Sequence, residues 1–210
     1  MKKFLLNPNE FMREAINSRY SLKIPIIILT INAIIGCFQV IYRITWVQQI
    51  FPPDVVASAT YMTFFGIQTV TALIIPFLAW IFYSGIFFTI SHFSGGDGDF
   101  RRVIQLSSYG YIPTIFDNTS ATVVNIIALR NTPPIGIDIS LWYSAVLSEH
   151  ISLLMGQSII SLLFLLWSAN IWVFAVKHAR NLTTKSAIIT VAIPIGAMMA
   201  YSVYQILGMI

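Results

Sequence analysis

Long apolar stretches separated by short polar connections set the pattern of this 210-residue chain. A helix needs about 20 apolar residues to cross a hydrocarbon core of about 30 Å. Five stretches come close to that length or exceed it, at residues 24–42, 63–91, 109–129, 151–176 and 187–207. The pattern therefore predicts an all-α integral membrane protein with five transmembrane helices.

The third stretch is the least regular of the five. Pro113 lies near its start, and a run of polar residues at 117–120 lies near its middle. Proline interrupts the hydrogen bonding of a helix, and within a membrane the freed backbone groups need new partners. We therefore expect the third helix to break after residues 109–113, with Asp117 capping a second half-helix that runs through Asn125.

The residues before the first stretch predict a short amphipathic helix. Asn7 has the position of an N-cap, Pro8 that of the first helical residue, and Glu10 can reach back to the cap. The apolar side chains of this helix fall on one side, at Phe11, Met12, Ala15 and Ile16. Such a helix either lies flat at the membrane surface or packs on the protein itself. We thus predict a cytoplasmic or interfacial segment at residues 1–23 and one five-span membrane domain at residues 24–210.

Basic residues distinguish the two sides of the membrane. Lysine and arginine are enriched in the cytoplasmic connections of membrane proteins. If all five stretches cross, Arg43 and Arg130 lie on one side, and the other ten of the 12 Lys and Arg residues lie on the side of the N-terminus. We therefore predict a cytoplasmic N-terminus, an external C-terminus, and a basic face toward anionic lipid headgroups.

The composition narrows the class of protein further. Hydrophobic residues make up 57% of the chain and charged residues only 10%, too few to cover a water-facing surface. The formal net charge of +4 belongs to the asymmetry between the two sides, so no basic domain remains that could bind nucleic acid. Cys37 is the single cysteine, which excludes a disulfide within the chain.

A glycine-rich connection between the second and third stretches has the most motif-like sequence. A phosphate-binding loop would require a preceding strand and a following Lys-Ser or Lys-Thr pair, which are missing. The acidic residues and His92 match no EF-hand or zinc spacing, so we predict no metal and no cofactor. The glycines favour a tight return, with an aspartate capping the next helix. This connection is a candidate cytoplasmic face for lipid or partner proteins, formed by Gly95, Gly96, Asp97, Asp99, Arg101 and Arg102.

Asp117 requires an explanation because an ionised carboxylate inside a bilayer is costly. Together with Asn118 and Asn125 it forms a candidate functional polar site in the third stretch. Capping or hydrogen bonding between helices is one explanation, and a proton or ion site is the other. No Ser-His-Asp order, HExxH, CxxC or pair of carboxylates at one depth is present, so we predict that the protein is not an enzyme.

Three short motifs resemble those of the Yip-domain membrane proteins, a family named for interaction with Ypt/Rab GTPases. The first is Asn7-Pro8-Asn9-Glu10-Phe11, before the first stretch. The second runs from Gly95-Gly96 to Phe100-Arg101-Arg102, and the third is Tyr109-Gly110-Tyr111-Ile112-Pro113. The resemblance covers nearly the whole chain and includes the plan of five spans.

The resemblance implies a role in membrane organisation or trafficking. Eukaryotic Yip proteins act in vesicle budding and in transport between the endoplasmic reticulum and the Golgi apparatus, and they bind prenylated Rab GTPases partly through a long cytosolic N-terminal region. Only 23 residues precede the first stretch here, so a Rab-type GTPase is not expected as a partner. The compact form is similar to archaeal and bacterial members, which implies the plasma membrane of a prokaryote.

We therefore predict a non-enzymatic membrane protein that organises lipid or partner proteins at its cytoplasmic face. A membrane-protein partner or a second copy of the chain would be the protein it contacts. The alternative is a small transporter or channel with a polar intramembrane site at Asp117.

Overall fold

The computed structural model describes residues 7–50, 59–132 and 139–208, and every regular element among them is helical. Five helical segments are long and apolar enough to cross a membrane. They are α3 (Lys23–Ile50), α5 (Ala59–Phe93), the continuous run of α6 (Phe100–Ser107), η1 (Ser108–Tyr111) and α7 (Ile112–Asn131), then α9 (Ile151–Ala179) and α10 (Thr184–Leu207). The predicted all-α, five-span architecture is confirmed.

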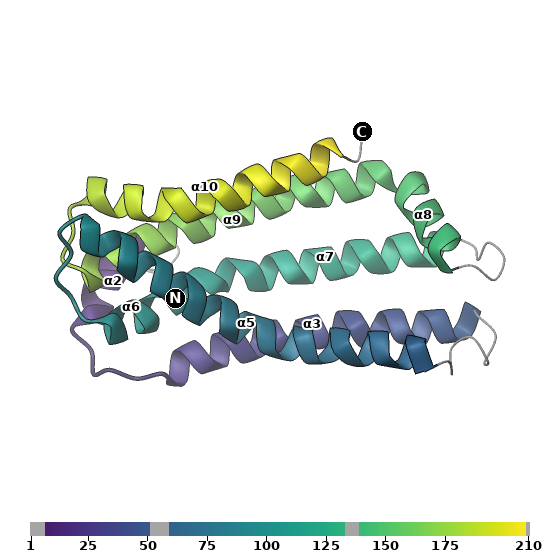
Figure 1. The fold of residues 1–210 in the computed structure, drawn as a ribbon, viewed down its shortest axis with the longest axis horizontal. Helices are drawn as coiled ribbons and strands as arrows, with labels where there is room; N and C mark the ends of the chain where they lie inside the picture. The colour runs from purple at the N-terminus through teal and green to yellow at the C-terminus, as the bar shows by residue number, and fades with distance from the viewer. Residues whose placement is uncertain (1–6, 51–58, 133–138, 209–210) are drawn as a thin grey trace.

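Two short helices occupy opposite ends of the bundle (Figure 1). Helix α2 (Pro8–Ile16) lies at the same end as α6, and α8 (Ile139–Glu149) lies at the other end, where α10 finishes. We call the first end the basic pole and define it as α2, α6, the first turns of α3 and α10, and the connections at residues 17–22, 94–99 and 180–183. Most of the positions in the chain that carry predicted motifs meet at this end.

Helix α7 lies between two helix pairs, α3 with α5 and α9 with α10 (Figure 1). It packs directly against α3 on one side and α9 on the other. Helix α5 runs diagonally, beginning along α3 and reaching α10 near the basic pole. The helices therefore converge at that pole, and α7 has a neighbour on each of two faces.

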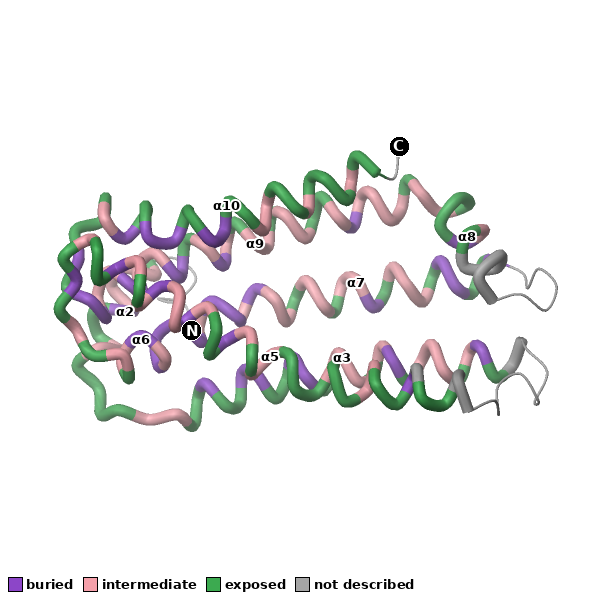
Figure 2. The backbone as a smooth tube through the Cα atoms, viewed as in Figure 1, coloured by how far each residue is buried: buried purple, intermediate pink, exposed green. Residues whose placement is uncertain are grey.

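The buried core is concentrated near the basic pole, where Figure 2 shows most of the buried residues. Phe87, Leu106, Trp172 and Val176 are among its fully or almost fully buried side chains. Along the rest of the spans, large apolar side chains remain exposed on the outer faces of the helices, including Ile34, Leu73, Phe82, Leu163 and Ile193. An apolar outer surface of this extent suits hydrocarbon rather than water.

The N-terminal helix begins as its sequence predicts and packs on the protein. The Asn7 side chain accepts a hydrogen bond from the backbone N–H of Glu10 at 3.1 Å, which confirms the cap. Met12 is completely buried, and the Phe11 ring packs edge-on against Tyr109 with ring centroids 5.1 Å apart. The apolar side of this amphipathic helix therefore packs on the protein, and Arg13 and Glu14 remain exposed on its other side.

Candidate functional site

The glycine-rich connection forms a closed helix end followed by a new helix start. Gly95 has φ +81°, a left-handed conformation that glycine adopts without steric cost. The N–H of Gly96 donates to the carbonyl of Ser91 at 2.8 Å, which completes the turn that ends α5. The Asp99 carboxylate then accepts from the N–H of Arg101 at 3.1 Å and caps α6. The predicted tight return and the predicted cap are both confirmed.

Arg180, at the end of α9, inserts its side chain into this connection. Its Nε donates to the Ser91 hydroxyl at 2.9 Å, and its two terminal nitrogens donate to the carbonyls of Gly96 and Gly98. The guanidinium also lies over the Phe88 ring, 4.2 Å from the ring centroid, and only 2% of the residue is exposed. The connection and the end of α5 therefore surround one buried arginine with hydrogen-bond acceptors and an aromatic ring.

Among the described residues, dipoles and an aromatic ring stabilise the charge of Arg180, and no carboxylate forms a direct ion pair with it. Burial lowers the pKa of the guanidinium and the nearby Asp97 carboxylate raises it, but an arginine remains protonated in proteins. Asp97 itself accepts a hydrogen bond from the Asn181 side chain at 2.8 Å. Because carbonyl oxygens carry partial negative charge, the glycine-rich backbone can hold a permanent cation.

Two glycines are required by close packing rather than by backbone conformation. A Cβ atom at Gly98 would overlap the backbone carbonyl of Ala179, next to Arg180. A Cβ atom at Gly110 would overlap the indole of Trp172. Both contacts are made by α9, so the second and third sequence motifs are each fitted to the same helix.

The residues of the candidate cytoplasmic face divide between the surface and the interior. Gly95, Asp97, Asp99 and Arg101 are exposed, whereas Gly96 is buried against Arg180. Arg102 is half-buried and donates through one terminal nitrogen to the carbonyl of Ser18 and to the Gln105 side chain, both at 2.9 Å. Arg102 thus ties α6 to the segment after α2, and the remaining four positions form the accessible part of the connection.

The third helix is interrupted, as predicted, by the four-residue 3-10 segment η1, which lies before Pro113 and not after it. Three backbone carbonyls around it accept hydrogen bonds from three neighbouring helices: Ile104 from Trp80 at 2.9 Å, Ser107 from Trp172 at 2.8 Å and Tyr111 from Asn32 at 3.2 Å. These side-chain bonds tie the backbone at and around the 3-10 segment to its neighbours, and Pro113 is tolerated because it lies in the first turn of α7. The motif at residues 109–113 is therefore a junction held by α5, α9 and α3.

Three residues of α9 that sequence reasoning missed connect all of the motifs. Trp172 contacts Gly110, His178 lies with Nε2 2.8 Å from Oδ1 of Asn9, and Arg180 holds the glycine-rich connection. For Trp172 and Arg180 the signal in the sequence is spacing, because with Val176 they recur every four residues and so share one helix face. His178 does not follow this spacing. That face becomes informative only when its partners are known.

Asp117 lies in the second turn of α7, and its predicted role as a helix cap is wrong. The N-cap of α7 is Tyr111, because the 3-10 segment ends one residue before α7 begins. The Asp117 carboxylate faces α9, where Oδ1 accepts from the Ser161 hydroxyl at 2.6 Å and from the Gln157 amide at 3.3 Å. Asp117 thus makes hydrogen bonds between helices.

Asn118 and Asn125 do not share the environment of Asp117. Asn118 faces α3, where its side-chain amide donates to Oδ1 of Asn32 at 3.0 Å and its backbone carbonyl accepts from the Gln39 side chain at 2.9 Å. Asn125 donates to the carbonyl of Ala121 in its own helix at 2.7 Å. The three residues of the predicted polar site therefore belong to three separate settings.

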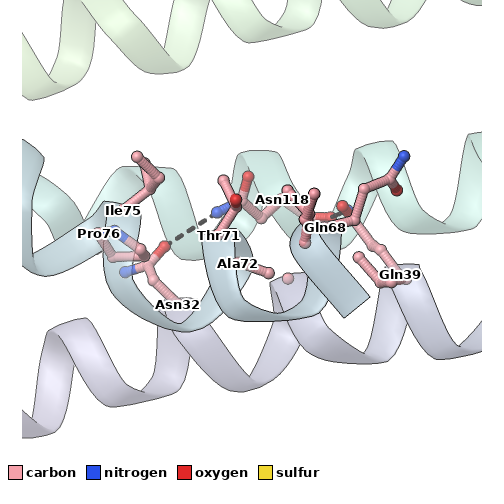
Figure 3. Close-up of a pocket in the computed structure, with 11 residues that line it drawn as sticks. Asn32, Gln39, Gln68, Thr71, Ala72, Ile75, Pro76 and Asn118 are labelled. Carbon is pink, nitrogen blue, oxygen red and sulfur yellow. Dashed lines mark hydrogen bonds between the residues drawn. The ribbon is translucent and has the colours of Figure 1, made fainter. Parts of the chain in front are cut away.

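The α3 face of α7 borders an open groove of about 350 Å³ between α3, α5 and α7. Figure 3 shows Asn32 and Asn118 joined by a hydrogen bond on one wall of this groove. Polar side chains line it at Asn32, Gln39, Gln68, Thr71 and Asn118. The groove combines neutral amides with apolar surface from Ile75 and Pro76, and it has no charged lining residue.

Comparison with known proteins places this architecture in a family. The family model for the Yip1 domain matches residues 2–204. A protein of Methanocaldococcus jannaschii named "Uncharacterized protein MJ0794" is 28% identical over 115 residues, which cover 53% of this chain and 77% of that protein. No solved structure matches the chain. The family match spans the five helices and all three motifs, so the chain belongs to the Yip1 domain family of multi-pass membrane proteins.

Proposed function

We propose that this protein is a non-enzymatic membrane organiser that gathers anionic lipid headgroups at its basic pole. The supporting observation is a set of exposed basic side chains on elements that the core holds in place. These residues are Arg13, Arg19, Lys23, Arg101 and Lys185. Cationic side chains next to a bilayer attract anionic lipids with about 1 kcal/mol per residue.

The basic pole differs from a flexible basic tail because its elements are fixed to the bundle. Met12 anchors α2 in the core, and Leu106 anchors α6. Arg102 links α6 to Ser18, and Arg180 closes the connection between α5 and α6. A preorganised array of charges loses less conformational entropy on binding than a disordered one.

An apolar side chain accompanies these charges. Phe93, the last residue of α5, is 85% exposed directly before the glycine-rich connection. Aromatic side chains commonly lie at the boundary between headgroups and hydrocarbon. Phe93 would therefore lie at the membrane interface and hold the basic pole at the level of the headgroups.

This function assigns the basic pole to the cytoplasmic side, the α8 end to the outside and the protein to the plasma membrane of a prokaryote. The bias of lysine and arginine supports the orientation. The cytoplasmic leaflet carries the negative surface potential that such a pole would recognise.

Lipid retention by the purified full chain tests the proposal. We expect the wild-type chain in nanodiscs to enrich phosphatidylglycerol over phosphatidylcholine. The Arg101→Gln/Lys185→Gln variant should weaken that preference by about thirtyfold, from about 1 kcal/mol for each removed charge. Arg43→Gln is the control, because Arg43 lies 20 residues beyond Lys23 along α3, about 30 Å from the basic pole by the rise of a helix.

Two results would contradict this function. One is equal retention of the two lipids by the wild-type chain. The other is crosslinking from position 101 in native membranes that recovers a protein and no anionic lipid, which would make the pole a protein-binding surface.

A further inference from the structure

Four polar side chains meet between α7 and α9 in the middle of the bundle. We call Asp117, Ser120, Gln157 and Ser161 the Asp117 cluster. The amide nitrogen of Gln157 lies 3.3 Å from Oδ1 of Asp117, 3.0 Å from the Ser120 hydroxyl and 3.3 Å from the Ser161 hydroxyl. Each helix contributes two residues, spaced by three or four positions, so the four side chains face one another.

The hydrogen bonds of the cluster do not balance. The amide nitrogen of Gln157 has two protons and three neighbouring oxygens. Gln157 is only 8% exposed, and its oxygen, Oε1, is buried without a hydrogen-bond partner among the described residues. Oδ2 of Asp117 likewise accepts no hydrogen bond from the described residues. The cluster therefore has more oxygen acceptors than the protein supplies donors.

The charge of the cluster does not balance either. The Ser161 hydroxyl lies 2.6 Å from Oδ1 of Asp117, a distance typical of an O–H bonded to an ionised carboxylate. No lysine, arginine or histidine of the described part of the chain pairs with Asp117. An ionised carboxylate in a membrane span is costly unless a positive charge accompanies it.

We propose that the Asp117 cluster binds a small monovalent cation of the Na⁺ class. The ligands are the carboxylate of Asp117, the hydroxyls of Ser120 and Ser161, and Oε1 of Gln157 after a half-turn of its amide. That half-turn places Oε1 where the amide nitrogen of Gln157 now lies, next to the oxygens of Asp117, Ser120 and Ser161. Carboxylate, hydroxyl and amide oxygens are ligands for hard cations.

The charge of the site selects a monovalent ion. One carboxylate is neutralised by one unit of positive charge, and the other ligands are neutral. Divalent and transition metals prefer several carboxylate, imidazole or thiolate ligands. No group of three or more His, Cys, Asp or Glu side chains able to hold a metal is present in the described ranges.

Thermal unfolding of the purified full chain in detergent tests the site. We compare NaCl, KCl and choline chloride at equal ionic strength. We expect the unfolding midpoint of the wild-type chain to rise by several degrees in NaCl relative to choline chloride, because the folded state alone binds the ion. Asp117→Asn, which keeps the shape of the side chain, should lose this response and match or exceed the wild-type midpoint in choline chloride.

Further variants separate ion binding from simple damage to the fold. Ser161→Ala removes one ligand and should raise the half-saturating sodium concentration about tenfold. Asn125→Ala is the matched control on α7, because among the described residues Asn125 bonds only within its own helix. Its response to sodium should equal that of the wild-type chain.

Three outcomes would overturn the proposal. The first is a wild-type midpoint that is the same in all three salts. The second is a sodium response that persists in Asp117→Asn. The third is stabilisation that follows pH and not sodium concentration, which would identify a proton as the only cation that the cluster takes.

Discussion

Arg180 and Asp117 are both charged residues packed between helices of this protein without a direct ion pair among the described residues, and their surroundings differ. The Arg180 guanidinium donates to one hydroxyl and two carbonyls and lies over an aromatic ring. The Asp117 carboxylate receives two donors at one oxygen, beside a buried amide oxygen that has no partner. The first site is saturated by the protein, and the second is not.

This difference separates a structural site from a candidate binding site. A saturated buried charge fixes the elements around it, because every neighbour would lose a partner if the charge were removed. An unsaturated cluster has oxygen atoms that can bind a cation. The comparison therefore predicts that stability is sensitive to substitutions in the contacts around Arg180, whereas the Asp117 cluster responds to its ionic environment.

Removing the cation at the basic pole should have the largest effect on stability. Arg180→Gln leaves the buried carbonyls of Gly96 and Gly98 without their donors, at about 1–3 kcal/mol each. We expect a loss of about 4 kcal/mol, measured as the denaturant midpoint in detergent. Arg101→Gln changes the same residue type at an exposed position and should cost less than about 0.5 kcal/mol. Equal effects of the two substitutions would remove the distinction between Arg180 and the surface arginines.

Adding one carbon atom beside Arg180 should have the next largest effect. Gly98→Ala forces the new methyl group into the backbone of α9 at Ala179, so we expect a loss of about 2–3 kcal/mol in the same measurement. Gly85→Ala is the matched control within α5, because a Cβ atom there meets nothing within 4 Å. That substitution should stabilise the helix by about 0.5–1 kcal/mol. A neutral Gly98→Ala would show that the connection does not fit closely around α9.

Removing a neutral amide of α3 that faces α7 should have the smallest of the three effects. Asn32→Ala breaks hydrogen bonds to Tyr111, Thr114 and Asn118, and intramembrane hydrogen bonds contribute about 0.6 kcal/mol each. We expect a loss of about 1.5 kcal/mol that is the same in sodium and choline salts. Gln68→Ala, in the same groove, removes an amide that has no hydrogen bond to a described residue and should change stability by less than about 0.5 kcal/mol. A sodium-dependent effect of Asn32→Ala would indicate that the ion binds between α3 and α7 and not at the Asp117 cluster.

Local sequence was sufficient to predict much of the fold. The five apolar stretches, the caps at Asn7 and Asp99, the turn at Gly95 and the interruption of the third helix were all predictable. Each depends on residues within about one helical turn of one another or on the length of an apolar run.

The candidate sites were predictable only in part, because their partners are distant in the chain. Asp117 was recognisable as an unusual residue in a span, but its partners Gln157 and Ser161 lie 40 and 44 residues away. Its role as a cap was wrong because α7 begins earlier, at Ile112. Arg180 was assigned only to the positively charged side, although it reaches Ser91 across 89 residues.

The sequence by itself determined that this protein is a five-span helical membrane protein with a basic side, because hydrophobic length and charge bias act locally and additively. The tertiary structure decided which polar groups are satisfied. It placed the Arg180 guanidinium against the carbonyls of Gly96 and Gly98. It left oxygens of the Asp117 cluster without donors among the described residues. Hydrogen bonds between helices require a fixed separation and orientation of two segments, and neither quantity is written in the pattern of one segment alone.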